Sequence, residues 1–186
     1  MRVFRKMEIE VENYQVGDQI IVPLRGIGGF TAIVQKVTDE GTLFLFDECV
    51  ARKAMNENGE NKGGYEASDL KKWIDTTLYM SFPEEMRDKM YGLTIPTVGQ
   101  IVGLESEWNN RNFEMDNEEQ FPLMNERKNR IVSFEGRIMQ AWLRNATKER
   151  YSSNHFACVA GFGYASCLPA SFTSGVRPEF WIKKGE

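Results

Sequence analysis

Short apolar segments with strand periodicity occupy the first quarter of the chain. Residues 19–24 are mostly apolar, residues 30–37 alternate and are rich in β-branched side chains, and residues 42–46 follow a turn at residues 39–41. This pattern predicts three strands joined by short turns, which is an N-terminal β-meander.

Helical spacing replaces strand periodicity in the next part of the chain. Ser68 is a suitable N-cap, and the apolar face that follows has members three and four residues apart, namely Leu70, Trp73, Ile74 and Thr77. We expect a second short helix over residues 83–91, a strand over residues 93–96, and a third helix over residues 97–104 with Thr97 as its cap.

The stretch 105–130 is polar and rich in Asn and Glu, which predicts a long irregular excursion. Short β segments return after residue 131, around residues 141–144, 156–159, 163–165 and 176–182. Helices segregated from strands predict an α+β fold, and the length fits one domain spanning residues 1–186. Strand patterns at both ends lead us to expect that the N- and C-terminal segments pair as neighbouring strands.

Charge and hydropathy restrict the classes of partner. The net charge is −4, so the chain has no basic footprint for nucleic acid. No apolar run approaches the roughly 20 residues that a membrane span needs, which predicts no membrane insertion. The first residues lack the apolar centre of a signal peptide. We therefore expect synthesis in the cytoplasm, with later assembly into a virus-like particle or export by another route left open.

The composition of residues 151–178 departs from that of the rest of the chain. Glu, Gln, Lys, Met and Trp make up 50 of the 186 residues, yet none occurs in this run. These five are the residues that codons ending in a pyrimidine cannot encode. One interpretation is a segment whose codons have been randomised at their first two positions. The other is an ordinary pair of strands or a loop rich in Gly, Ser and Ala.

Four motifs in this order and spacing resemble an uncharacterised domain family of bacteria and bacteriophages. They are Val16-Gly17-Asp18, Ser68-Asp69-Leu70-Lys71-Lys72-Trp73, Ala141-Trp142-Leu143-Arg144 and Gly175-Val176-Arg177-Pro178. That family resembles the C-type-lectin fold, in the version shared with formylglycine-generating enzymes and with the variable proteins of diversity-generating retroelements. The resemblance covers roughly residues 14–183 and implies a C-type-lectin-like fold.

Retroelement targets that resemble this chain carry an Asn-rich tract between the Trp-Leu-Arg motif and the Gly-Val-Arg-Pro motif. Adenine-directed mutagenesis of Asn codons, which end in a pyrimidine, yields the residue set found here. The resemblance therefore implies that residues 151–172 form a diversified surface. Its candidate ligand-binding side chains are Tyr151, Ser153, His155, Phe156, Cys158, Ala160, Phe162, Tyr164, Ser166, Cys167, Leu168, Ser171 and Phe172.

The same run contains residues with other possible chemistry. His155, Cys158 and Cys167 follow no common zinc spacing and have no fourth ligand nearby, so we expect no metal. Cys158 and Cys167 could form a cross-strand disulfide or remain small unpaired side chains. Formylglycine-generating enzymes use a redox-active pair of cysteines, but in a different sequence context and spacing.

Scaffold roles are expected for the residues of the motifs. We predict that Trp73 and Trp142 are mostly buried, and that Arg144 and Arg177 form buried ion pairs or bond the backbone. Four residues of the C-terminal run should be inward or constrained by the backbone, namely Val159, Gly163, Gly175 and Arg177. Four others should face solvent together: His155, Tyr164, Ser166 and Leu168.

These observations favour a non-enzymatic protein that binds an unknown protein or cell-surface ligand and needs no cofactor. It would be a retroelement variable protein of phage or prophage origin. Two alternatives from other classes stay open at this point: an enzyme related to formylglycine-generating enzymes, and an intracellular structural module.

Overall fold

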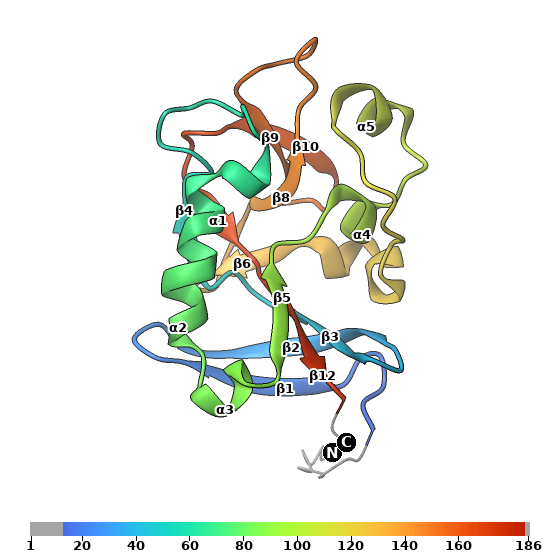
Figure 1. Cartoon of the computed structure of the whole chain (residues 1–186). Helices are drawn as coiled ribbons and strands as arrows, with labels where there is room; N and C mark the ends of the chain where they lie inside the picture. The colour runs from blue at the N-terminus through green and yellow to red at the C-terminus, as the bar shows by residue number, and fades with distance from the viewer. Residues whose placement is uncertain (1–12, 185–186) are drawn as a thin grey trace.

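Two five-stranded sheets form most of the protein. The computed structural model describes residues 13–184 (Figure 1). The first sheet has the strand order β1 (Gln19–Leu24), β2 (Gly28–Val37), β3 (Gly41–Phe46), β12 (Glu179–Lys183) and β5 (Met90–Thr94). The second has the order β10 (Ala165–Pro169), β9 (His155–Val159), β8 (Ala141–Ala146), β11 (Ser174–Val176) and β4 (Ala51–Lys53). A separate hairpin joins β6 (Val132–Phe134) to β7 (Arg137–Met139).

The helices are short and lie outside the sheets. A continuous helical segment comprises α1 (Asp69–Trp73), a π-helical turn (Ile74–Leu78) and α2 (Tyr79–Ser81). The others are α3 (Glu84–Arg87), α4 (Val98–Val102) and α5 (Glu107–Asn112), with 3₁₀ turns at Tyr65–Ala67, Pro122–Asn125 and Arg127–Arg130. None of the helices within residues 13–184 has the length and apolar character required to span a bilayer.

Capping side chains fix where two of these helices begin. The Ser68 hydroxyl accepts a hydrogen bond from the Lys71 amide at 3.0 Å. Thr97 and Gln100 form a reciprocal capping box, in which each side chain accepts from the other residue's amide, at 3.1 and 2.8 Å. Both caps were predicted from the sequence, and both are confirmed.

The core has two main clusters that share the same strands. Phe44, Phe46, Trp142, Phe156 and Phe180 belong to the first cluster, which the α1–α2 helix covers. The second cluster includes side chains that point to the other side of the same strands, together with helix α4: Leu43, Leu45, Val98, Leu143, Ala157 and Val159. Strand β3 is consequently buried on both faces, which explains its unbroken apolar run.

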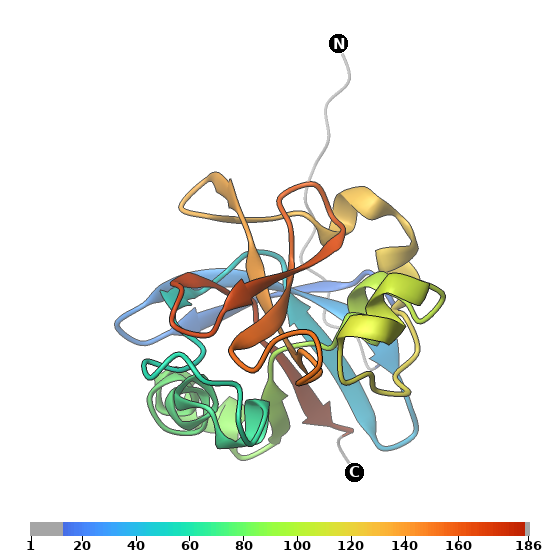
Figure 2. The same cartoon turned by 90° about the horizontal axis from the view of Figure 1, so that it is seen from above.

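The sheets lie one above the other. Strands β8, β9 and β10 lie at the opposite end of the molecule from β1 and β2 (Figure 1). Seen from above, they lie over the strands of the first sheet (Figure 2). The chain is therefore a mixed α+β protein in which strands predominate, as the segregation of the sequence patterns predicted.

The β-meander is confirmed, but several later expectations are wrong in detail. Thr77 is exposed because the π-helical turn shifts the face by one residue, so that Leu78 takes the buried position. The 83–91 helix ends at Arg87, and strand β5 begins at Met90, ahead of the expected 93–96 strand. The segment 105–130 carries α5 and two 3₁₀ turns, because Phe113, Phe121 and Met124 anchor it in the second core cluster.

The C-terminal strands also differ from the expected segments. Gly163 lies in the β9–β10 turn with a φ of 82°, and the strand begins only at Ala165. The expected 176–182 strand is divided into β11 and β12, which belong to different sheets. The first and last strands share a sheet, but β12 pairs with β3 and β5 and is separated from β1 by two strands. The N- and C-terminal segments therefore pair as expected, through β3 and β12, although β1 itself is not a neighbour of β12.

Candidate functional site

Residues 151–172 form a loop, the β9–β10 hairpin and a short return towards β11. The hairpin has a regular antiparallel register that runs from Ala165 opposite Val159 to Pro169 opposite His155. Residues outside the segment hold much of its backbone. The Asn61 side-chain amide donates to the carbonyls of Ser152 and His155 at 3.1 Å each, and the Thr147 hydroxyl donates to the same two carbonyls at 2.7 and 2.9 Å.

Glycines fix the backbone at two further points. Gly163 has positive φ, and a Cβ atom there would lie 2.8 Å from the Arg127 carbonyl oxygen. At Gly175 a Cβ atom would lie 2.5 Å from the Cys49 sulfur. Val159 and Arg177 are buried, and Arg177 donates from Nε to the Phe46 carbonyl at 2.6 Å. The predicted inward or constrained state of these four residues is confirmed.

Four aromatic side chains of the segment point outward. Tyr151, Phe162, Tyr164 and Phe172 are exposed by 46, 67, 51 and 52 %. Ser153 and Ser171 are also exposed, whereas His155, Ser166, Cys167 and Leu168 are partly buried. His155, Tyr164, Ser166 and Leu168 were expected to face solvent together. That expectation is only partly correct, because Leu168 packs against the first core cluster.

The outward aromatic residues do not form one continuous patch. Phe162 and Phe172 line a 490 Å³ concavity together with Ser166, Ile138 and Arg52. Tyr164 lies 6.3 Å from Phe162 between ring centroids, and its ring also faces the Arg127 guanidinium. Tyr151 contacts strand β10, with its hydroxyl 3.8 Å from the Cys167 sulfur. The segment therefore presents two neighbouring surfaces on either side of the hairpin.

Three of the candidate surface residues are buried. Phe156 and Cys158 are completely inaccessible, and Ala160 is almost so. Alternation along β9 directs Phe156 and Cys158 into the first core cluster, and Ala160 lies at the start of the tight turn. These three side chains cannot contact a ligand in this structure, and their assignment to the surface is wrong.

The cysteines do not form a pair. In the hairpin register Cys158 lies opposite Ser166, and Cys167 lies opposite Ala157, so the two thiols point to opposite faces. All three cysteines of the chain are free, and burial raises the pKa of Cys158 to about 12. Among residues 13–184 no cluster of three or more His, Cys, Asp or Glu side chains is arranged to hold a metal ion.

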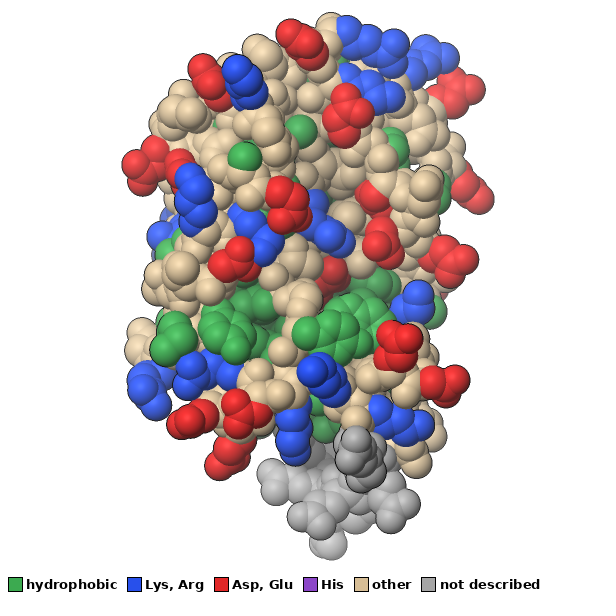
Figure 3. All heavy atoms as spheres, viewed as in Figure 1, with side chains coloured by type: hydrophobic (Ala, Val, Ile, Leu, Met, Phe, Trp, Pro, Cys, Tyr) green, Lys and Arg blue, Asp and Glu red, His purple; other side chains and the backbone are tan. Residues whose placement is uncertain are grey.

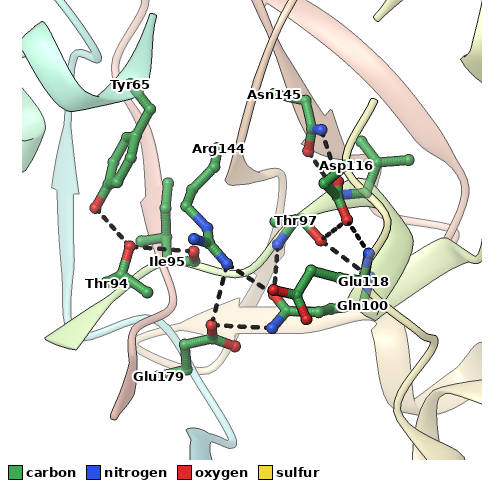
Figure 4. A network of polar contacts seen from close by, with 11 residues as sticks. Tyr65, Thr94, Ile95, Thr97, Gln100, Asp116, Glu118, Arg144, Asn145 and Glu179 are labelled. Carbon is green, nitrogen blue, oxygen red and sulfur yellow. Dashed lines mark hydrogen bonds and ion pairs between the residues drawn. The ribbon is translucent and has the colours of Figure 1, made fainter. Parts of the chain in front are cut away.

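A second cluster of polar side chains lies between the two sheets, around Arg144 of β8 (Figure 4). Its guanidinium lies 3.5 Å from the Glu179 carboxylate and donates to the Gln100 side-chain oxygen at 3.3 Å. Gln100 in turn donates to the same Glu179 oxygen at 3.2 Å. A buried ion pair or backbone bonds were expected for Arg144, whereas no sequence pattern indicated a role for Glu179 or Gln100.

This cluster continues towards the 114–118 segment. Asp116 accepts hydrogen bonds from the Thr97 hydroxyl at 2.9 Å and from the Asn145 amide at 2.8 Å. Asn145 also accepts from the Val98 amide at 2.7 Å, so strand β8 is tied to the start of helix α4. Both carboxylate oxygens of Asp116 are thereby hydrogen-bonded within the scaffold.

Two clefts meet at Arg144. One, of 850 Å³, is bounded by residues 60–66, by β8 and by Glu114 and Asp116. The other, of 550 Å³, lies among β2, β5, β12 and residues 118–122. Glu66 and Arg144 line both clefts. Burial raises the pKa of Glu179, on the floor of the smaller cleft, to about 7, and the nearby Arg144 charge opposes that rise.

Comparison with known families gives one match. A family model described as "Domain of unknown function (DUF6273)" matches residues 40–184. The chain belongs to this family. The DUF6273 region begins at the β2–β3 turn and contains both the 151–172 segment and the Arg144 cluster, while β1 and β2 precede it. No curated protein and no solved structure matches the chain.

Proposed function

We propose that this DUF6273 protein binds a protein or cell-surface ligand through the exposed side chains of residues 151–172. The observation that carries the proposal is the separation of backbone from side chain. Asn61, Thr147, Gly163 and Gly175 hold the backbone, whereas four aromatic side chains project into solvent. Tyr and other aromatic residues supply rigid contact area at low entropic cost, which is how binding loops use them.

We further propose that this surface is diversified by a retroelement on a C-type-lectin-like scaffold of phage or prophage origin. The support is compositional, since a run of residues all encodable by pyrimidine-ending codons coincides with the outward-facing hairpin and loop. A scaffold that tolerates diversification must obtain its stability elsewhere. Both main core clusters draw most of their members from outside the segment.

The formylglycine-generating-enzyme alternative receives no support from the thiols. A redox-active pair needs two sulfurs within bonding distance, whereas Cys158 and Cys167 point to opposite faces of the hairpin. The buried Cys158 thiol, with its raised pKa, is also a poor source of thiolate.

A randomised library tests the binding proposal. One library varies the exposed positions Tyr151, Ser153, Phe162, Tyr164, Ser171 and Phe172, and a matched library varies the buried positions Phe156, Cys158 and Ala160. Resistance to proteolysis reports folding, and panning against immobilised streptavidin reports binding. We expect most clones of the first library to fold and to yield streptavidin binders.

The matched library controls for general tolerance of substitution. We expect most of its clones to be digested, because they change side chains packed in the core. If the library of exposed positions is digested as readily, or yields no binder from a folded population, the proposed role of this surface is wrong.

A further inference from the structure

The 550 Å³ cleft beside the Arg144 cluster has the construction of a small-molecule site. Its walls include the apolar side chains Val37, Leu93, Phe121 and Trp181, and its floor holds Gln100, Arg144 and Glu179. Ligand sites in proteins are typically concave and largely apolar, with a few convergent polar groups that orient the ligand. In the view of Figure 3, hydrophobic side chains gather at the level of β5, and charged side chains lie above and below them.

Two polar atoms on the floor are left without a partner. Glu179 Oε1 is bonded by Gln100 and lies near Arg144, whereas Glu179 Oε2 and Arg144 Nε have no hydrogen-bond partner among the described residues. Figure 4 shows that the second oxygen of Glu179 points away from both neighbours. Glu179 is buried almost completely, and buried polar atoms without a hydrogen-bond partner are rare in folded proteins.

Trp181 gives the cleft one flat wall. Its indole is half-buried and stacks on the Tyr91 ring, with centroids 5.8 Å apart and planes inclined by 18°. Gly92 lies against the indole edge, where an added Cβ atom would be 3.1 Å from Cδ1. Tyr91 and Gly92 thus fix the orientation of Trp181 before any ligand arrives, and this preorganisation lowers the cost of binding.

Charges around the cleft are mixed in sign. Lys36 and Lys71 lie on its rim with Glu66, Glu118 and Glu119, and Arg144 on the floor is matched by Glu179. A strongly charged ligand would be repelled either by the basic or by the acidic side chains of the cleft. The cleft therefore favours a neutral ligand that carries both hydrogen-bond donors and acceptors.

We propose that this cleft binds the ring of a neutral sugar, with one ring face against Trp181 and neighbouring hydroxyl groups on Arg144 and Glu179. A hydroxyl group donates one hydrogen bond and accepts two, so adjacent hydroxyls can satisfy the free acceptor and the free donor together after small side-chain adjustments. This site is separate from the 151–172 surface and does not depend on the function proposed for that surface.

The protonation of Glu179 favours hydroxyl groups over other neutral ligands. With a pKa of about 7, this carboxyl group is partly protonated near neutral pH. A hydroxyl can donate to the carboxylate or accept from the carboxylic acid, so it suits both forms. The edge of a nucleobase has donors and acceptors at fixed atoms and suits only one form.

Titration calorimetry with methyl glycosides of glucose, mannose and galactose, at millimolar concentrations, tests the proposal. We expect at least one glycoside to bind the wild-type protein and to change its tryptophan fluorescence, a change that Trp181→Phe should remove. Glu179→Gln removes one acceptor at nearly constant volume and should weaken binding by about tenfold. Trp181→Phe, which keeps an apolar but smaller wall, should weaken it as well.

The exposed substitution Glu84→Gln on α3 is the matched control and should leave binding unchanged. Thermal melts of all variants identify any that fail to fold, and the Trp181→Phe result stands if Glu179→Gln is one of them. The proposal is overturned if none of the three glycosides binds, if guanosine binds in their place, or if the folded cleft variants bind as tightly as the wild type.

Discussion

The buried carboxyl group of Glu179 should make the stability of the protein depend on pH. Burial raises its pKa from the ordinary 4.5 to about 7, against the opposing influence of Arg144. One pKa unit corresponds to about 1.4 kcal/mol, so the folded state retains this proton more strongly than the unfolded chain by about 3 kcal/mol. The full contribution is present below pH 4.5 and is lost as the pH rises through 7.

Denaturant unfolding of the wild type and of Glu179→Gln, at several pH values between 4.5 and 8, measures this contribution. Gln cannot titrate, and other ionisable groups contribute almost equally to both proteins. The stability of the wild type relative to the variant should therefore fall by about 3 kcal/mol across this range. Glu118 and Asp116, which lie near Glu179, add to the rise of its pKa, whereas Gln100 lowers it by hydrogen bonding.

Glu84→Gln is again the matched control, because it removes an exposed carboxyl group and leaves the cleft unchanged. A constant difference between wild type and Glu179→Gln would rule out a raised pKa for the buried carboxyl group. It would mean that Glu179 titrates alike in the folded and unfolded states, and that its carboxylate is effectively solvated.

Three further predictions concern the scaffold. Trp142→Ala should lower the unfolding free energy by about 3–5 kcal/mol in chemical denaturation, because Trp142 is fully buried and its indole donates to the Lys53 carbonyl at 2.8 Å. Trp73→Ala, at a half-buried position, should cost clearly less, and equal losses would contradict this. Gly163→Ala should lower the unfolding free energy by more than about 1 kcal/mol, because φ is positive at Gly163 and an added Cβ atom would meet the Arg127 carbonyl. A neutral effect in a thermal melt would be inconsistent with the β9–β10 turn. When a thiol-specific reagent is added to the native protein, Cys167 should react well before Cys49 and Cys158, because those two side chains are completely buried. Rapid labelling of all three cysteines would contradict the burial of Cys49 and Cys158 and the hairpin register.

Patterns confined to a single element were sufficient to predict the first three strands and two helix caps. Those signals are local, because alternation and cap residues act within a few positions. The π-helical turn was missed since one inserted residue leaves the apolar spacing almost unaltered, and only Leu78 and Thr77 exchange roles. The division of the last strand at Arg177 and Pro178 was missed because it depends on which sheet each half joins.

The candidate site was predicted only in part, because composition is a local signal whereas strand pairing is not. Composition identified the segment, but the faces of β9 depend on its register with β8 and β10, so Phe156 and Cys158 were assigned to the wrong side. The Arg144 cluster brings Gln100 and Glu179 together from distant parts of the chain. No local pattern marks such a meeting, although Glu179 follows directly on the terminal Gly-Val-Arg-Pro motif.

We propose above that residues 151–172 are a diversified recognition surface. The most direct measurement is to sequence the DNA around the gene. We expect a reverse transcriptase gene and a near-copy of the coding sequence for this segment. The copy should differ from the gene at adenine positions, chiefly in codons for exposed residues such as Tyr151, Phe162, Tyr164 and Phe172, and should leave the Gly163 codon unchanged. The absence of such a copy, or differences spread equally over Gly163 and Gly175, would contradict it.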